Sequence, residues 1–580
     1  MRTATDQTFV SADGTQLFYR RWAPSSSATR RALIVFHRGH EHSGRMQAVV
    51  DGLDLPEFDI FAWDARGHGR SPGERGYAED IGVLVKDVDS FVRHVCETHR
   101  YAQGDVAIVA QSVGAVLVAT WLHDFAPKVR CAVLASPAFE VKLYVPFAIP
   151  GLRLLLKLKG KAFVNSYVKA KFLTHDPERI SSYQADPLIT RAIAVNILIG
   201  LFDVAERVIA DAAAIVTPTQ VLISGADWVV HQKPQKRFFE RLGAAVKEFH
   251  EFAGFYHDTL GEKDRHLPLA RAREFILRQF ESAVSVPSLL AADEAGHTKD
   301  EYDRLAAPAS VPSALYYGAT RMGFATLGRL SDGIALGLRT GFDSGSTLDY
   351  VYRNVPSGKT PLGRLFDAAY LNSIGWKGIR IRKQHIESLL ARVFAMLLSS
   401  GQPVRLVDIA AGHGRYVVEA LEGLKGRDFG ALLRDYSALN VESGRTLIAS
   451  RGLSERVSFE SGDAFDPQSL AAIPRDRTVA VISGLYELFP DNARIRRSLT
   501  GVAQALVQGA YLVYTNQPWH PQLELIARTL SSHRGGQPWV MRRRVQAEMD
   551  QLVEEAGFSK LDQLVDQWGI FSVSLARKTA

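Results

Sequence analysis

Three residues in the first half of the chain have side chains that together can perform nucleophilic chemistry on a carbonyl carbon: Ser112, Asp227 and His257. Ser112 lies in Ala-Gln-Ser-Val-Gly, directly after a β-branched run at 106–110 and before a helical pattern. A serine on such a sharp strand-to-helix turn exposes its hydroxyl, and small residues two positions away relieve crowding of the backbone. Taken alone, this A-x-S-x-G pattern is also compatible with a serine that caps a helix.

The positions of the other two residues extend the pattern. Asp227 follows the apolar run 220–224, so its carboxylate is predicted at the carboxyl end of a strand, and His257 follows another short strand pattern. The order serine, aspartate, histidine is that of α/β-hydrolases. The chain resembles this superfamily over about residues 8–282, and within it the monoacylglycerol lipase and lysophospholipase-like hydrolases. Four further segments carry the resemblance: 37–45 (HRGHEHSGR), 64–71 (DARGHGRS), 174–188 (THDPERISSYQADPL) and 227–242.

The resemblance implies a role for each of these residues in ester hydrolysis. Ser112 would attack the carbonyl, His257 would take and return its proton, and Asp227 would fix the imidazole tautomer. The backbone N–H groups of Val113 and Gly39 would hold the oxyanion. The expected substrate is a lipid-like acyl ester or another small-molecule ester.

One stretch departs from the family pattern. Similar enzymes usually carry His-Gly-x-Gly where this chain has His-Arg-Gly-His at 37–40. Two alternatives therefore stay open: a hydrolase-like domain that binds lipid without catalysis, and an acyltransferase in which Ser112 passes its acyl group to an alcohol other than water. The histidines at 40, 42 and 68 lie in turns that the family also carries, so no metal site is expected.

A second group of residues, after position 404, is typical of a nucleotide-type cofactor site. The apolar run 404–409 leads to Gly412 and Gly414. Glycines at the carboxyl end of a first strand let a ligand approach the backbone closely. An NAD-binding domain shares this signal, but it favours a third glycine where this chain has Val417.

Acidic residues follow the next two predicted strands. Asp435 comes after the run 430–434 and can bind a ribose diol, and Asp463 comes after 457–460 and can accept from an adenine amine. The remaining strand patterns are 478–483, 510–515, 561–565 and 570–575. Five parallel-type units closed by a terminal strand pair resemble a class I S-adenosylmethionine-dependent methyltransferase, over about residues 379–580.

This second resemblance implies S-adenosyl-L-methionine as cofactor and assigns residues to it. Asp408 and Gly412 would contact the methionine end, Asp435 the ribose and Asp463 the adenine. The other predicted cofactor-binding residues are Ala410, Gly414, Ala464 and Ser483.

The methyl acceptor is less defined by the sequence. Residues after the fourth and fifth strands face the methyl group in this fold, which gives the acceptor-side candidates Tyr486, Glu487, Trp519 and His520. Glu487 or His520 can act as a base, and for each candidate a purely structural role is the alternative. Two basic clusters, Arg380, Arg382 and Lys383, and Arg542–Arg544, are interpreted as solvated helix faces, with an anionic acceptor as the alternative.

The elements that must position these residues divide the chain into four parts. The fold class is α/β: an α/β-hydrolase fold at 1–285 with a helical cap at about 137–217, and a Rossmann-like class I methyltransferase fold at 379–580. Residues 286–312 are polar and rich in proline and alanine, which predicts a linker, and 313–378 are predicted to form a helical adaptor. The prediction is a bifunctional enzyme in which the methyl acceptor is lipid-related.

Composition limits the setting in which this enzyme works. The chain has 580 residues and a formal charge of +7, which favours an anionic surface or substrate over nucleic acid. Its two cysteines exclude a disulfide framework, and its first residues lack a signal sequence, so a cytoplasmic protein is expected. The cap segment 143–172 combines apolar residues with lysines. This pattern predicts peripheral contact with an anionic membrane, such as the inner membrane, or else a cap helix with a solvated basic face.

Overall fold

The computed structural model describes residues 2–25, 30–166, 168–283 and 286–579. Its contacts divide the chain into two compact units, Met1–Pro287 and Ser288–Ala580. The boundary expected at residue 285 lies outside the described residues. Within the described ranges, no helix has both the length and the apolar character needed to cross a membrane.

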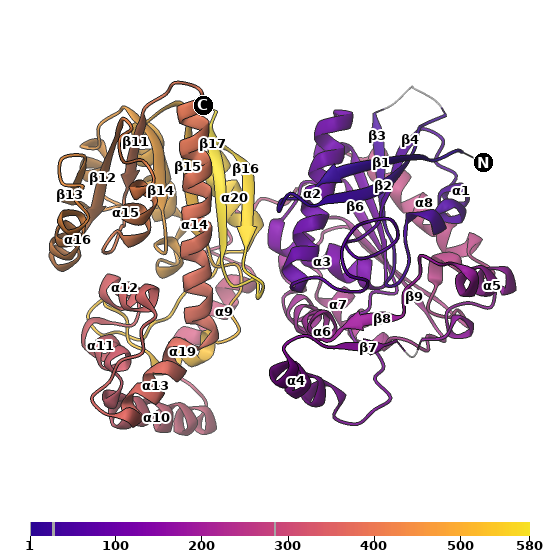
Figure 1. The fold of residues 1–580 in the computed structure, drawn as a ribbon, viewed down its shortest axis with the longest axis horizontal. Helices are drawn as coiled ribbons and strands as arrows, with labels where there is room; N and C mark the ends of the chain where they lie inside the picture. The colour runs from indigo at the N-terminus through magenta and orange to yellow at the C-terminus, as the bar shows by residue number, and fades with distance from the viewer. Residues whose placement is uncertain (1, 26–29, 167, 284–285, 580) are drawn as a thin grey trace. The chain divides into compact units, whose positions relative to one another are not determined.

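The first unit is built on an eight-stranded sheet (Figure 1). In sheet order the strands are β1 (Thr5–Val10), β2 (Gln16–Trp22), β4 (Phe58–Trp63), β3 (Arg31–Phe36), β5 (Val106–Gln111), β6 (Cys131–Ala135), β9 (Thr219–Ser224) and β10 (Lys247–Phe252). β1, β2 and β4 pair antiparallel, and every later pair is parallel. Every residue of β4, β5, β6 and β9 is buried, as expected when helices cover both faces of a parallel sheet.

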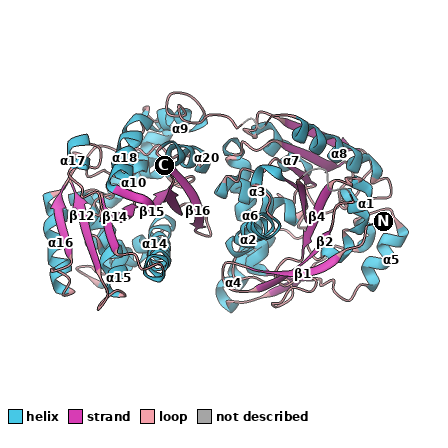
Figure 2. Cartoon of the chain, turned by 90° about the horizontal axis from the view of Figure 1, so that it is seen from above, coloured by secondary structure: helices cyan, strands magenta, loops and turns pink. Residues whose placement is uncertain are grey.

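Two groups of helices cover this sheet (Figure 2). α1 (Gln47–Leu53) and α8 (His266–Glu281) contact each other and share one apolar core with the sheet. α2 (Ile81–His99), α3 (Val113–Phe125) and α6 (Val195–Ala210) pack together on the other face, and α7 (Gln232–Arg241) joins α6. α3 begins directly after β5, so the strand-to-helix turn expected around Ser112 is present.

The cap lies between β6 and β9 and is mostly helical. It contains α4 (Ala148–Lys159) and α5 (Pro177–Ala185). The helical cap expected at about 137–217 also contains strands, because β7 (Phe163–Asn165) and β8 (Ala192–Ala194) form a short antiparallel pair. α4 has no buried residue.

The second unit is built on a seven-stranded sheet. In sheet order the strands are β13 (Val457–Ser461), β12 (Phe429–Asp435), β11 (Val404–Asp408), β14 (Arg477–Ile482), β15 (Leu506–Asn516), β17 (Ser572–Lys578) and β16 (Phe558–Val565). The first five are parallel, and β17 pairs antiparallel with both of its neighbours. One face packs on α14 (Ile374–Ser399), α15 (Arg415–Glu422) and α16 (Ala438–Ser450), and the other on α17 (Pro467–Ala471), α18 (Asn492–Ala505) and α20 (Gln546–Glu555).

A bundle of short helices precedes this sheet. It comprises α10 (Val311–Ala325), α11 (Asp332–Thr340), α12 (Gly345–Arg353) and α13 (Pro361–Leu371), followed by α14. The buried carboxylate of Asp367 organises it, accepting from Ser331 Oγ at 2.6 Å, from Gly333 N and Ser357 N at 2.9 Å and from Tyr350 Oη at 2.5 Å. The expected division at 378/379 falls inside α14, because this one helix packs on the adaptor at one end and on the sheet at the other.

The segment expected to be a linker is largely part of the second unit. It forms α9 (His297–Ala306), in which Leu305 is buried against Leu523 and Ile526. Leu290 packs on the sheet core, and the carboxylate of Asp293 accepts from Asn492 N at 2.6 Å. Leu290 and Leu305 each reach a core, whereas Val286 and Val311 are exposed, so two apolar residues are enough to attach this polar segment to the second unit.

We expect residues 1–287 and 288–580 each to fold when produced separately, because each unit holds its own core. A fragment that begins at 313 should unfold roughly 5 °C or more below one that begins at 288, since it loses the burial of Leu290 and Leu305. Calorimetry of the two fragments measures the difference. Equal unfolding temperatures would mean that residues 288–312 contribute no stability.

Candidate functional site

Ser112 occupies a strained turn between β5 and α3. Its backbone has φ +56° and ψ −117°, a region that residues with a side chain rarely adopt. Gly114 makes this turn possible, because a Cβ there would lie 2.5 Å from the carbonyl oxygen of His37. The turn therefore lifts the Ser112 hydroxyl out of the helix, and no side-chain capping bond holds it.

The structure brings Ser112, His257 and Asp227 into one hydrogen-bonded chain. Ser112 Oγ lies 2.7 Å from His257 Nε2, and His257 Nδ1 lies 2.8 Å from Asp227 Oδ2. Asp227 follows β9, and its other oxygen accepts from the N–H groups of Val229 and Val230 at 2.7 and 3.0 Å. All three side chains are buried.

The charge on Asp227 is stabilised by its neighbours. Burial alone would raise its pKa, but the His257 imidazole and the two backbone N–H donors outweigh it, and the pKa lies below its usual value. Asp227 is therefore ionised at neutral pH and accepts from His257 Nδ1–H. This tautomer leaves Nε2 free to take the proton of Ser112.

The two residues predicted to hold an oxyanion are packed together. A Cβ on Gly39 would lie 3.1 Å from Val113 Cγ2. His40, which stands where similar enzymes have glycine, has φ +66° and keeps the left-handed backbone in spite of its side chain. Burial, helped by His68 and Arg38, lowers the pKa of His40 to about 3, so its imidazole adds no charge to the loop.

Arg38, the other departure from the family pattern, belongs to a buried network of four charges. It pairs with Glu41 at 2.9 Å, and Arg179 of the cap donates to Asp258 at 2.5 Å and lies 3.6 Å from Glu41. Asp258 is adjacent to His257 and also accepts from Gln111 Nε2 at 2.9 Å. The network thus joins the 37–41 loop, the turn at Ser112, the loop that carries His257 and the cap.

The second unit has a cavity of about 840 Å³ at the carboxyl ends of β11, β12 and β14. Seven of the predicted cofactor residues line it: Ala410, Gly412, Gly414, Asp435, Asp463, Ala464 and Ser483. Asp408 does not. It lies beneath the loop, where Tyr416 Oη donates to it at 2.7 Å, and burial raises its pKa to about 7. Its role is therefore to support the glycine loop from below.

Asp435 and the glycine loop are joined directly. Gly412 N donates to Asp435 Oδ2 at 2.9 Å, and Ser437 N and Asn440 Nδ2 donate to Oδ1 at 2.9 and 3.0 Å. Gly414 has φ +73°, and a Cβ there would lie 2.2 Å from Leu433 Cδ2. The Gly412–Asp435 hydrogen bond and the close packing of Gly414 on Leu433 hold the glycine loop against β12. No side chain at Gly412 or Gly414 covers the backbone that a ligand would approach.

Sequence reasoning missed that the adaptor supplies one wall of this cavity. The turn at 341–345 lies over the glycine loop: a Cβ on Gly412 would be 3.4 Å from Gly345 Cα. Asp343, Ser344 and Asp349 of the same region line the cavity. The glycine-rich turn was a visible signal, but nothing in the sequence linked it to residues so far along the chain.

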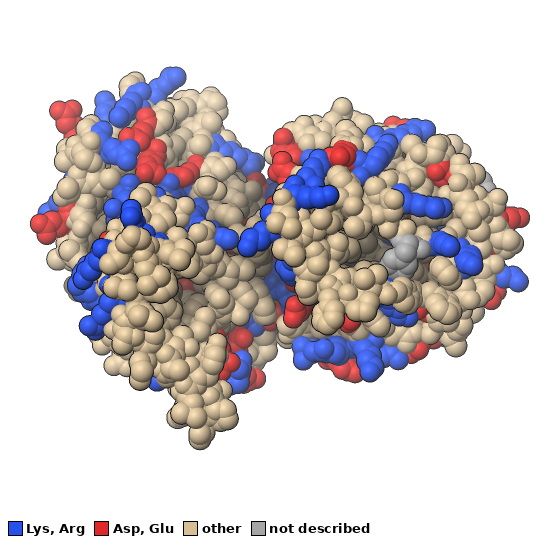
Figure 3. Space-filling model, turned by 60° about the horizontal axis from the view of Figure 1, so that its bottom comes forward, with Lys and Arg blue, Asp and Glu red and all other residues tan. Residues whose placement is uncertain are grey.

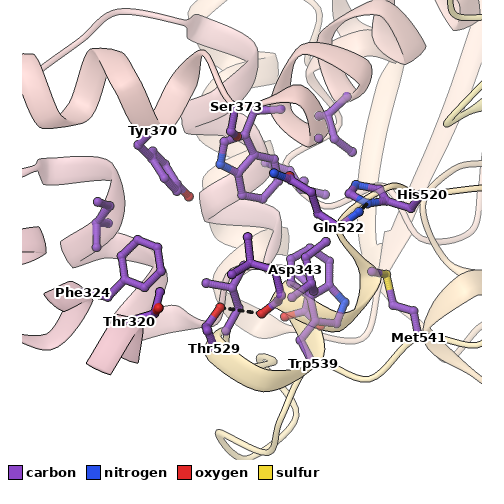
Figure 4. Close-up of a pocket in the computed structure, with 18 of the residues that line it drawn as sticks. Thr320, Phe324, Asp343, Tyr370, Ser373, His520, Gln522, Thr529, Trp539 and Met541 are labelled. Carbon is purple, nitrogen blue, oxygen red and sulfur yellow. Dashed lines mark hydrogen bonds between the residues drawn. The ribbon is translucent and has the colours of Figure 1, made fainter. Parts of the chain in front are cut away.

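Figure 4 shows a second cavity of this unit, which has a volume of about 560 Å³ and shares lining residues with the first. Five residues line both: Asp343, Leu348, Arg382, Gly484 and Leu488. Of the four acceptor-side candidates, Glu487 and His520 line this cavity. Tyr486 Oη instead donates a hydrogen bond to Ser498 Oγ at 3.0 Å in the core. The guanidinium carbon of Arg543 lies over the Trp519 ring, 5.8 Å from its centroid.

The two candidates that reach this cavity differ in their protonation. Gln522 N donates to His520 Nδ1 at 3.0 Å, so the proton of the neutral ring is on Nε2. Burial lowers the pKa of His520 to about 4, which leaves a neutral donor rather than a base. Burial raises the pKa of Glu487, and Arg382, 3.4 Å away, opposes that shift.

The interpretation of the basic clusters as solvated helix faces is wrong for four of the arginines. Arg382 is buried between Glu487 and the ring of Phe571, which lies 4.9 Å from its guanidinium carbon. Arg542, Arg543 and Arg544 are also buried, in an irregular segment before α20. Arg542 is paired bidentately with Glu548 at 2.9 Å, and Arg544 donates to the carbonyl oxygens of Tyr486 and Phe489 at 2.7 and 2.8 Å.

Comparisons with known proteins divide the chain in the same way. A family model described as "Putative methyltransferase" matches residues 272–578, and one described as "Serine aminopeptidase, S33" matches 27–264. "Uncharacterized protein YnbC" of Escherichia coli is 52% identical over 98% of this chain and 97% of its own length. Human monoglyceride lipase is 32% identical over 43% of this chain and 82% of its own.

Among solved structures, a Paleococcus ferrophilus monoacylglycerol lipase superposes with a TM-score of 0.41 at 24% identity, covering 45% of this chain and 99% of that one. The two family models and the human relative show that the chain belongs to the family described as "Putative methyltransferase", and that in it this domain is fused to an α/β-hydrolase domain related to the monoglyceride lipases.

Proposed function

We propose that the chain is a bifunctional enzyme: a serine esterase that hydrolyses a lipid-like acyl ester, and a methyltransferase that uses S-adenosylmethionine. The observation that carries the first activity is the hydrogen-bonded chain Ser112–His257–Asp227. The second rests on the glycine loop and Asp435, which line a cavity beside a separate apolar one.

In the hydrolase unit, His257 Nε2 removes the proton of Ser112 as Oγ bonds to the ester carbonyl carbon. The carbonyl oxygen then carries the negative charge and accepts from the N–H groups of Val113 and Gly39. The protonated His257, stabilised by Asp227, gives its proton to the leaving alcohol. A water then bonds to the acyl carbon as His257 takes its proton, and His257 returns that proton to Ser112 Oγ when the carbon–Oγ bond breaks and the acid leaves.

The residues of the larger cavity fit S-adenosylmethionine. Asp435 Oδ2 accepts only from Gly412 N among the described residues, so it can also accept from a ribose hydroxyl, and the Ser483 hydroxyl is buried with no hydrogen-bond partner among the described residues. Phe465 and Phe489 lie in the wall near Asp463, where a base can stack. When bound, the cofactor would supply a methyl group attached to a positively charged sulfur.

The cap supports a further part of the proposal, contact with an anionic membrane. α4 is wholly unburied, and Phe147, Leu154 and Leu158 around it are 86%, 57% and 75% exposed. Lys157 and Lys159 end the helix. An apolar helix surface flanked by lysines suits the interface of an anionic bilayer.

Replacing the nucleophile tests the esterase. Ser112→Ala should lower the hydrolysis of a short p-nitrophenyl ester by roughly 10⁴–10⁶-fold, and His257→Ala similarly, because members of a triad act as a unit. The exposed Ser182→Ala serves as control and should keep full activity. A fluorophosphonate should label the wild type but not Ser112→Ala. Unlabelled wild-type protein would favour a lipid-binding module without catalysis.

Removal of one carboxylate tests the cofactor site. Asp435→Ala should weaken S-adenosylmethionine binding at least about tenfold, since hydrogen bonds to a charged group are worth roughly 1.5–3 kcal/mol each. Asp428→Ala, an exposed carboxylate of the same unit, should bind normally. Calorimetry with S-adenosylmethionine and with NAD measures both. Binding of NAD in place of S-adenosylmethionine would refute the assignment.

Vesicle sedimentation tests the cap. The protein should bind anionic vesicles better than neutral ones, and added salt should weaken binding, because each lysine contributes about 1 kcal/mol near such a surface. Leu154→Ser combined with Leu158→Ser should reduce binding, whereas Leu267→Ser, which is 48% exposed on α8, should not. Equal and salt-insensitive binding to both vesicle types would count against membrane contact through the cap.

A further inference from the structure

The smaller cavity of the second unit is apolar along most of its length. Phe324 and Leu327 come from the adaptor, Trp376 and Ile379 from α14, and Trp539 from the loop before α20. The Trp376 and Trp539 rings stack with centroids 6.3 Å apart. Figure 4 shows these walls converging from the adaptor and from the loops that follow β15. Such a cavity accommodates a hydrocarbon chain without the loss of hydrogen bonds that a polar ligand would suffer.

The charged residues that line this cavity are Asp343, Arg382 and Glu487, and the first two also line the cofactor cavity. Tyr370 Oη and Trp539 Nε1, elsewhere in the wall, are buried without a hydrogen-bond partner among the described residues. Glu487 Oε2 and Arg382 Nε are buried and have no hydrogen-bond partner among the described residues. Both side chains are more than nine-tenths buried. Buried polar atoms without partners are costly, so their persistence at a cavity wall points to a ligand that supplies the missing bonds.

The helix that forms the outer wall is apolar on both sides. α10 lines the cavity through Thr320, Gly323 and Phe324, while Leu315 and Met322 are 71% and 68% exposed. Arg321 is its only charged residue. In Figure 3, where the bottom of Figure 1 comes forward, the adaptor region of this unit shows mostly uncharged side chains. α10 can move away from the rest of the cavity wall and let an apolar molecule enter, since the polar and charged groups that would hold a helix face in water are few on both of its sides.

We propose that this cavity binds the methyl acceptor, and that the acceptor is a lipid-like molecule with one long apolar chain that ends in a hydroxyl or amine group placed against Glu487. The hydrocarbon chain of the acceptor lies between α10 and α14, and its polar end reaches the wall shared with the cofactor cavity. The proposal rests on the methyltransferase activity proposed above and specifies its substrate class.

Glu487 is the base in this arrangement. The acceptor's oxygen or nitrogen forms a bond to the methyl carbon while the carbon–sulfur bond of the donor breaks and its electron pair stays on sulfur. The acceptor's proton passes to Glu487 Oε2. Arg382, which touches both cavities, keeps the carboxylate oriented through Oε1. His520 can donate from Nε2 but cannot take this proton.

Tryptophan quenching by 12-bromododecan-1-ol tests the cavity in the full chain. The bromine should quench Trp376 and Trp539 with saturation. Ala369→Phe, which fills the cavity from α13, should weaken binding at least tenfold, while Leu365→Phe, on the same helix, 64% exposed and not a lining residue, should bind like the wild type. Equal binding by Ala369→Phe and wild type, or equal losses in both variants, would overturn the proposal.

Two further measurements separate the base from the binding site and this proposal from the activity on which it rests. Glu487→Gln should bind the bromoalcohol and S-adenosylmethionine normally, yet form S-adenosylhomocysteine about 10²–10⁴-fold more slowly with a total lipid extract. Undiminished turnover would remove Glu487 as the base. If S-adenosylmethionine fails to bind in calorimetry while the bromoalcohol still saturates, the methyltransferase assignment fails and the apolar site stands.

Offering the bromoalcohol either as free monomer or in phosphatidylcholine vesicles identifies the source of the ligand. Quenching from vesicles supports a membrane lipid, and quenching from monomer alone supports a free amphiphile with the same chemistry. Quenching in neither form overturns the proposal.

Discussion

The buried ion pair between Arg382 and Glu487 joins the long helix α14 to the carboxyl end of β14 in the second unit. Arg382 belongs to α14, which carries the adaptor, and Glu487 belongs to the loop after β14. Removing two charges from water is costly, and this pair is compensated only in part, because each partner keeps an unsatisfied atom. The surroundings must therefore hold it in place. Arg544 does so from the other side by binding the carbonyl oxygens of Tyr486 and Phe489.

The hydrolase unit also buries charged side chains, which are paired in a network around Glu41 and Asp258. The buried side chains of Arg38, Arg179, Glu41 and Asp258 lie next to His257 and pair with one another. Because Arg179 comes from the cap, the position of the cap is coupled to the loop that carries His257. In both units, residues far apart in sequence meet where parallel strands end, the edge at which α/β folds place their chemistry.

Much of this arrangement could be predicted from the sequence. In the first unit Ser112 and Asp227 follow parallel strands, and in the second Gly412 follows one and Asp435 ends one. Because the carboxyl ends of parallel strands share an edge, each pair is expected at one edge of its own sheet. The strands at 106–110, 220–224 and 404–409 were predicted to within one or two residues.

The positions that could not be predicted are set by contacts between residues far apart in the chain, which leave no pattern in the nearby sequence. The sequence around Arg542 is typical of a solvated surface, but the structure buries this residue in an ion pair with Glu548. Leu305 lies in a polar segment, yet it is buried against Leu523. Asp408 precedes the glycine loop as a ligand-binding acid would, yet Tyr416 holds it below that loop. The position of the turn at 341–345 in the cavity wall could not be predicted either, since it depends on packing against Gly412.

The most direct test of the account is the anomalous bromine signal in crystals of the full chain grown with S-adenosylmethionine and 12-bromododecan-1-ol. The account predicts a bromine peak near Phe324, between α10 and α13, the hydroxyl within hydrogen-bond distance of Glu487, and the cofactor beside Asp435. Bromine found only on the outer surface of the adaptor, with the cavity unfilled, would contradict it.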